Sequence, residues 1–133
     1  MRSTSRSAVF DTSALVALIR GEPEAEQIIQ RIEQGGVFYV ASPTILELQL
    51  VLSGRPGRDA LADVKAAKER IGFTVVPFTE AHTDAAFTAW QRYGKGRHPA
   101  ALNLGDCMSY AVAKVAQAEL VYVGDDFSRT DLA

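Results

Sequence analysis

The stretch SAVFDTSALVALIR (residues 7–20) decides the fold, because an apolar run stops at an aspartate and a helical pattern begins there. The run SAVF is short and apolar, which predicts a buried strand. After Asp11, the side chains of Leu15, Leu18 and Ile19 share one face of a helix. The segment therefore predicts a strand that leads directly into a helix, with a carboxylate at the junction.

The rest of the chain repeats this alternation. The sequence GEP (21–23) breaks the helical pattern, so we expect a second helix that ends at Gly35-Gly36. After the second strand, Ser42 is predicted to cap a helix in which Pro43 is the first helical residue. Further strands are predicted over 37–41, 73–78 and 119–124, and further helices over 44–52, 59–71, 79–93 and 106–118.

This order predicts an α/β protein whose parallel sheet is covered by helices on both faces. A length of 133 residues suits one domain, which we expect to cover residues 1–133, with residues 1–7 as a loose N-terminal extension. Apolar residues make up 47% of the chain and charged residues 23%, values that exclude a disordered protein.

Charge and the rarity of cysteine and histidine narrow the possible chemistry. The chain has 14 basic and 16 acidic residues, so it lacks an overall basic field for holding nucleic acid. Cys107 is the single cysteine, and His82 and His98 are the two histidines, which excludes a disulfide within the chain and a zinc site built on cysteines. The N-terminal apolar stretch is too short for a signal peptide or a membrane span, so we expect a cytoplasmic protein without membrane association.

Acidic residues stand where the chemistry of a parallel sheet is expected. Ligands of such sheets bind beyond the carboxyl ends of the strands. Asp11 follows the first predicted strand, and Asp125 and Asp126 follow the last one. Asp106 begins an Ala-rich helix, while Glu47 lies on an apolar helical stripe, an unusual position for a solvated carboxylate. These acids can converge at one edge of one sheet.

Each acid also has a purely structural interpretation. Asp11 can cap the helix that starts at Thr12, and Asp106 can favour the positive end of its helix. Glu47 can pair with a lysine or an arginine. Asp125 and Asp126 can be turn residues after a glycine. The joint pattern is more specific than any single position.

Convergence of the acids would have a physical consequence. Two carboxylates about 4 Å apart repel each other by roughly 4 kcal/mol at an effective dielectric near 20. Such a cluster needs a cation or must take up protons, and all-oxygen ligands favour Mg²⁺ or Mn²⁺ over zinc. Metal ions held in this way activate water and stabilise both oxygens of a phosphodiester that is being cleaved.

Four blocks of the sequence resemble one known family. They are VFDTSALVALIRGEPEA (9–25), SPTILELQLVL (42–52), HPAALNLGDCMSYAVAK (98–114) and VYVGDDFSRTDL (121–132). In this order and spacing they resemble PIN-domain ribonucleases, specifically VapC-like toxins of type II (VapBC) toxin–antitoxin systems. The resemblance implies a Rossmann-like, three-layer α/β/α fold with a mostly parallel sheet of four to five strands. It also implies a Mg²⁺-dependent endoribonuclease that cleaves cellular RNA and inhibits growth.

The resemblance also assigns roles to individual residues. Asp11, Glu47 and Asp106 match the first three acids of the family, and Asp126 is favoured as the fourth, with Asp125 as a second candidate. Asp11, Asp106 and Asp126 are expected to bind the metal. Supporting roles are implied for the hydroxyl residues Thr12 and Ser13 beside the metal's waters, for Asn103 in orienting carboxylates, and for Asp131 as an outer residue of the site.

Partners follow from the same resemblance. A VapB-like antitoxin is expected to neutralise the toxin in a hetero-oligomer, and the toxin itself is expected to be a homodimer. The Gly-containing loop before the Asp106 helix carries basic residues that can contact RNA phosphates or can simply be solvated. These candidates for RNA binding are Arg92, Lys95 and Arg97.

Other classes fit the sequence less well. A phosphatase of the haloacid-dehalogenase type needs a second aspartate two residues after the first, where this chain has Ser13. A receiver domain needs an aspartate after a middle strand, and the strands predicted over 37–41 and 73–78 supply none. A catalytically silent PIN-like interaction module remains the alternative, although it would be expected to lack some of the acids.

Overall fold

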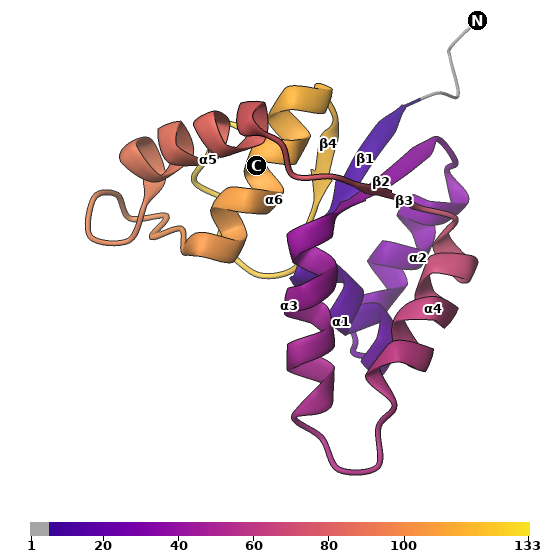
Figure 1. Ribbon diagram of the computed structural model, residues 1–133. Helices are drawn as coiled ribbons and strands as arrows, with labels where there is room; N and C mark the ends of the chain where they lie inside the picture. The colour runs from indigo at the N-terminus through magenta and orange to yellow at the C-terminus, as the bar shows by residue number, and fades with distance from the viewer. Residues whose placement is uncertain (1–5) are drawn as a thin grey trace, which may run out of the picture.

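The computed structural model describes residues 6–133, and the order of its strands and helices is the predicted one (Figure 1). The elements are β1 (Ser7–Phe10), α1 (Thr12–Arg20), α2 (Ala25–Glu33), β2 (Val37–Ala41), α3 (Ser42–Ser53), α4 (Ala60–Ile71), β3 (Thr74–Val76), α5 (Glu80–Tyr93), α6 (Leu104–Ala116) and β4 (Glu119–Val121). Among these residues, no helix is long and apolar enough to cross a membrane.

The four strands form one sheet in the order β3-β2-β1-β4, and every pairing is parallel. Successive side chains of a strand point to opposite faces, so Ala8 and Phe10 pack with α1 to α4 while Val9 packs with α5 and α6. Figure 1 shows these two groups of helices on opposite sides of the sheet. The predicted three-layer α/β/α architecture with a parallel sheet is therefore confirmed.

Several boundaries differ from the prediction for identifiable reasons. The prediction of Ser42 as a cap was wrong, because Ala41 holds that position and Ser42 is already helical. Strand β3 ends at Val76, since Pro77 has no N–H to donate to the sheet. Strand β4 ends at Val121, and the N–H of Val123 donates to the Ser13 hydroxyl at 3.0 Å instead of extending the ladder.

Residues 1–7 were predicted to be a loose extension. This prediction was wrong for Ser7, which lies in β1, and residues 1–5 lie outside the described part of the chain. Ser7 begins β1 and pairs with Val37, whose N–H donates to the Arg6 carbonyl at 3.0 Å. Gly36 permits this approach, since a Cβ there would lie 1.9 Å from the Arg6 carbonyl oxygen. Pairing with the neighbouring strand thus orders the chain from Arg6 onward.

Candidate active site

Asp11 lies at the carboxyl end of the central strand β1 and is buried. Its carboxylate caps α1 by accepting the backbone N–H of Ser13 at 3.1 Å and the Ser13 hydroxyl at 2.7 Å. Its own N–H donates to the carbonyl of Val121 at 3.0 Å, which ties the end of β1 to the end of β4. Capping and participation in a site are therefore compatible for Asp11, because its side chain is held at the edge of the sheet.

Glu47 reaches the same region from α3. The hydroxyl of Thr12 donates to its carboxylate at 2.6 Å, so the partner of this half-buried acid is a neighbour of Asp11 and not a lysine or an arginine. A Cβ placed on Gly105 would lie 2.7 Å from both carboxylate oxygens of Glu47. The first turn of α6 therefore packs directly against Glu47, and the absence of a side chain at residue 105 leaves the room that this carboxylate occupies.

Asp106 lies in the first turn of α6 and is buried. The Asn103 side chain accepts the N–H of Asp106 at 2.8 Å, and the Asp106 carboxylate accepts the N–H of Asn103 at 3.1 Å. This reciprocal capping box starts α6 at Leu104, two residues earlier than predicted. Asn103 thus orients Asp106 through its backbone N–H, while its side chain caps the helix.

The electrostatics of Asp106 show which acids lie close to it. Burial first, and then the nearby carboxylates of Asp126 and Asp11, together raise the pKa of Asp106 to about 7 against the lowering effect of the Asn103 N–H. Asp126 also hydrogen-bonds to Asp106. Three acids from the ends of β1 and β4 and from the start of α6 are therefore brought together.

The structure separates the two candidates for the fourth acid. Asp126 meets Asp106, whereas the backbone carbonyl of Asp125 accepts the N–H and the hydroxyl of Ser128 and so begins a turn. Phe127, which follows directly, is buried against Tyr122 and anchors this turn in the core. The arrangement supports Asp126 as the site residue and a turn role for Asp125.

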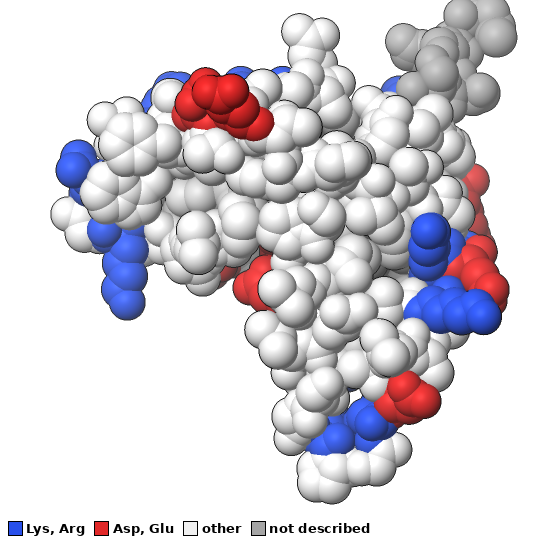
Figure 2. All heavy atoms as spheres, in the orientation of Figure 1, with Lys and Arg blue, Asp and Glu red and all other residues white. Residues whose placement is uncertain are grey.

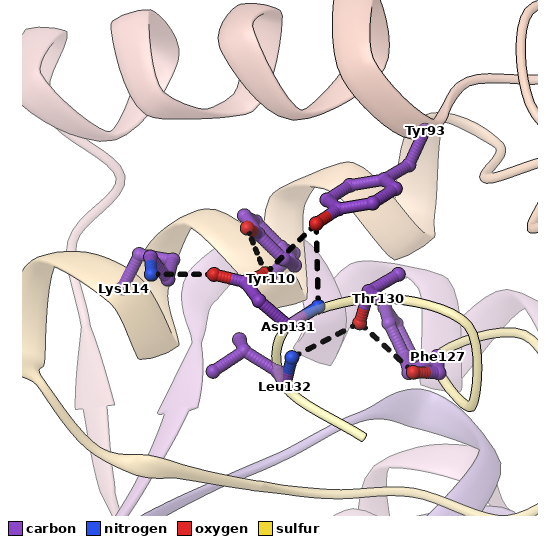
Figure 3. Close-up of polar contacts among 7 residues, drawn as sticks. All are labelled: Tyr93, Tyr110, Lys114, Phe127, Thr130, Asp131 and Leu132. Atoms are coloured by element: carbon purple, nitrogen blue, oxygen red, sulfur yellow. Dashed lines mark hydrogen bonds and ion pairs between the residues drawn. The ribbon is translucent and has the colours of Figure 1, made fainter.

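Asp131, Arg92 and Arg97 have contacts of their own. The Asp131 carboxylate accepts hydrogen bonds from Tyr110 and Lys114 of α6 (Figure 3). The guanidinium of Arg92 lies 4.8 Å from the centre of the Tyr93 ring, and that of Arg97 lies 4.2 Å from the centre of the Trp90 ring. Figure 2 shows acidic atoms in a notch between the arm of α5 and α6 and the arm of α3, with basic atoms on the outer end of the first arm.

The donor set fits a hard divalent cation, because every candidate ligand is a carboxylate oxygen. Within residues 6–133, no three Asp, Glu, His or Cys side chains are already arranged to hold a metal ion. Burial of Asp106, with Asp126 and Asp11 nearby, raises its pKa, so the charged form of this carboxylate is costly without a cation. A cation there would stabilise the charged forms of Asp11, Asp106 and Asp126 together.

Comparisons with known proteins agree with this fold. The family model described as PIN domain matches residues 8–132. Ribonuclease VapC36 of Mycobacterium tuberculosis is 42% identical over 93% of this chain and 90% of its own length. Ribonuclease VapC30 of the same species is 38% identical over 94% of this chain and 95% of its own length.

Solved structures show the same fold at lower identity. VapC20 of Mycobacterium tuberculosis, a toxin that cleaves the sarcin-ricin loop, has a TM-score of 0.73 and 21% identity over 95% of this chain and 96% of its own. VapBC2 of Rickettsia felis, bound to a DNA fragment from its promoter, has a TM-score of 0.75 and 15% identity over 95% of this chain and 94% of its own. The chain belongs to the PIN-domain family and, within it, to the VapC ribonucleases, which confirms the resemblance noted in the sequence.

Replacing Gly105 with alanine should separate activity from stability. The new Cβ would displace the Glu47 carboxylate, and a misplaced group of this kind costs roughly ten- to a hundredfold in rate. The melting temperature should stay the same or rise slightly, because alanine is favoured over glycine in a helix by about 1 kcal/mol. RNA cleavage and thermal unfolding of Gly105→Ala check this, with Gly54→Ala as the control. Equal activity in both variants would contradict the placement of Glu47.

Asp106→Asn should stabilise the metal-free protein in a pH-dependent manner. The pKa of Asp106 is about 7 in the folded protein and 3.8 ordinarily, so protonation favours the folded state. This contribution to stability is present below pH 4 and is lost as the pH rises to about 7. In EDTA, the melting temperature of Asp106→Asn minus that of the wild type should therefore grow between pH 5 and pH 8. A constant difference would show that burial does not destabilise the charged carboxylate.

Proposed function

We propose that this chain is a metal-dependent endoribonuclease that acts as a toxin, cleaves cellular RNA to inhibit growth, and is neutralised by a VapB-like antitoxin in the cytoplasm. The observation that carries the proposal is that Asp11 and Asp126 each lie near enough to the buried Asp106 to raise its pKa, at the carboxyl edge of the sheet. Membership of the VapC ribonucleases supports the same activity. A silent interaction module would have no need for three mutually repelling carboxylates.

In the proposed mechanism, Asp11, Asp106 and Asp126 hold one or two Mg²⁺ ions, for which Mn²⁺ can substitute. A cation bound there would activate a water molecule and stabilise negative charge on the phosphodiester. Glu47 orients the attacking water, and the Thr12 hydroxyl keeps its carboxylate in place. The Ser13 hydroxyl and the Asn103 N–H hold the carboxylates of Asp11 and Asp106 in the same way, so three of the four acids have a hydrogen-bond donor of their own.

Binding of RNA next to such an acidic site needs local positive charge, because the chain as a whole carries a charge of −2. Arg92, Lys95 and Arg97 are exposed at the end of α5 and in the loop that follows it. This loop leads through Asn103 into α6 and Asp106. We assign these three residues to contacts with RNA phosphates on the approach to the acids.

The partners are proposed to be the antitoxin and a second copy of the chain. Leu46 and Leu50 of α3 and Leu104 of α6 are 58%, 66% and 75% exposed. Leu104 and Met108 line both the groove beside α3 and a groove of about 420 Å³ beside α5, so the apolar surface is continuous. An exposed apolar surface of this kind is typical of a protein interface, and we assign it to the homodimer.

The nuclease proposal predicts a metal requirement. Purified protein without antitoxin should cut total cellular RNA into discrete fragments in Mg²⁺, should be inactive in EDTA, and should recover in Mg²⁺ or Mn²⁺. Asp11→Asn should reduce cleavage by more than the roughly ten- to hundredfold typical of losing a residue that merely supports a metal ligand. Electrophoresis of the RNA products measures both effects.

The matched control is Asp59→Asn. Asp59 also caps a helix, since it accepts the N–H of Ala62 at 3.1 Å, and asparagine caps equally well. This variant should cleave RNA like the wild type. Activity that persists in EDTA would refute the metal mechanism, and folded protein that cleaves no RNA under any condition would favour the silent interaction module.

If the apolar surface of α3 and α6 forms the dimer interface, a charge introduced on this surface should prevent dimerisation, and a charge introduced elsewhere should not. Leu50→Lys should convert a dimer into a monomer, because a buried lysine without a partner opposes association. Leu61→Lys is the control, since Leu61 is 71% exposed on α4 and does not line the apolar grooves. Light scattering coupled to size-exclusion chromatography gives the masses. A wild-type monomer, or a Leu50→Lys dimer, would contradict the assignment.

A further inference from the structure

The C-terminal segment folds back from the end of β4 along α6 and closes on itself (Figure 3). The Thr130 hydroxyl donates to the carbonyl of Phe127 at 2.8 Å, and the N–H of Leu132 donates to the same hydroxyl at 3.2 Å. Phe127 and Thr130 are both buried. Asp126 and Asp131 therefore belong to one compact turn and not to a free chain end.

Asp131 joins this turn to α5 and α6. Its carboxylate accepts the hydroxyl of Tyr110 at 2.5 Å, the ammonium of Lys114 at 2.8 Å and the hydroxyl of Tyr93 at 3.4 Å. The N–H of Asp131 also donates to the Tyr93 oxygen at 3.3 Å. We call Tyr93, Tyr110, Lys114 and Asp131 the clasp.

The chemistry of the clasp favours a charged carboxylate. Burial raises the pKa of Asp131, but the hydrogen bonds from Lys114 and Tyr110 outweigh this effect and lower it. Burial, together with the Asp131 carboxylate, raises the pKa of Tyr110, so that its phenol remains a donor at neutral pH. The clasp is therefore an attractive contact between charged and polar groups.

Helix α6 receives the C-terminal turn at two points. Asp106 and Tyr110 are one helical turn apart, and Lys114 follows one turn later. At the first point Asp126 meets Asp106, where two carboxylates repel each other when both are charged. At the next turns Asp131 meets Tyr110 and Lys114, where the contact is attractive. The attractive contact is in a position to oppose the repulsive one.

We infer that Asp131 is a positioning residue, and that the clasp holds the C-terminal turn on α6 so that Asp126 stays beside Asp106 at the metal site. The inference rests on the proposed function, because it assumes that Asp126 is a metal ligand. The resemblance implied that Asp131 is an outer residue of the metal site. In this inference Asp131 acts on the site only by holding Asp126 in place. Phe127 anchors the turn in the core, and the clasp fixes its orientation.

Two variants of the full chain test this inference. Asp131→Ala removes the clasp carboxylate, and Tyr110→Phe removes only one hydroxyl and keeps the buried ring. Both should increase hydrogen exchange of the amides between Gly124 and Leu132. Calorimetry should show Mn²⁺ binding weakened about tenfold by Asp131→Ala and less by Tyr110→Phe, within the range typical of residues that support metal ligands. Excess metal should restore most of the RNA cleavage.

Asp63→Asn is the matched control. Asp63 forms an ion pair with Arg58 at 2.9 Å far from α6, and its side chain is exposed to a similar degree, 27% against 31% for Asp131. This variant should bind Mn²⁺ like the wild type.

The outcomes separate the inference from the proposed function. Wild-type protein that binds no Mn²⁺ and cleaves no RNA overturns both. Wild-type protein that binds and cleaves, with clasp variants of equal Mn²⁺ affinity, overturns only the inference. Faster exchange in the turn with unchanged Mn²⁺ affinity also overturns it, because the clasp would then be a tether of the chain end without effect on Asp126.

Discussion

Burial of the Asp106 carboxylate beside Asp126 and Asp11 is the constraint on which the rest of this structure depends. Like charges in a partly dry site repel each other strongly, so the protein must hold them by other contacts. Two of these acids receive a hydrogen-bond donor of their own: Ser13 donates to Asp11, and the N–H of Asn103 donates to Asp106. Hydrogen bonds consequently hold Asp11 and Asp106 in place, while the repulsion between the carboxylates costs stability that a bound cation would recover.

The parallel sheet is what brings the acids into range. Strand β1 lies between β2 and β4, so the chain leaves β1 and β4 at neighbouring points of the same edge. The early end of β4 is part of this arrangement, because it frees the N–H of Val123 to bind the Ser13 hydroxyl. The Ser13 hydroxyl thereby connects Asp11, to which it donates, with the segment that leads to Asp126.

Periodicity and spacing predict the order of elements and the edge at which Asp11 and Asp106 gather, because strand ends and helix starts have local signals. They do not distinguish Asp125 from Asp126, since both follow Gly124 and only the folded chain brings Asp126 close to Asp106. Nor does any local signal reveal that Gly105 accommodates Glu47, because those residues meet through packing of α3 on α6. Contacts between residues far apart in the sequence decide both of these features.

The first turn of α6 serves two surfaces at once. Leu104 points outward with 75% of its surface exposed, while Asp106, two residues later, points inward to the acids. The same division holds on α3, where Leu46 and Leu50 flank Glu47 along one groove. A protein that covers this apolar surface would therefore lie within one helical turn of two site carboxylates. Association and cleavage then share the middle of α3 and the first turn of α6, so a partner can influence the acids through rigid helices without contacting the metal site itself.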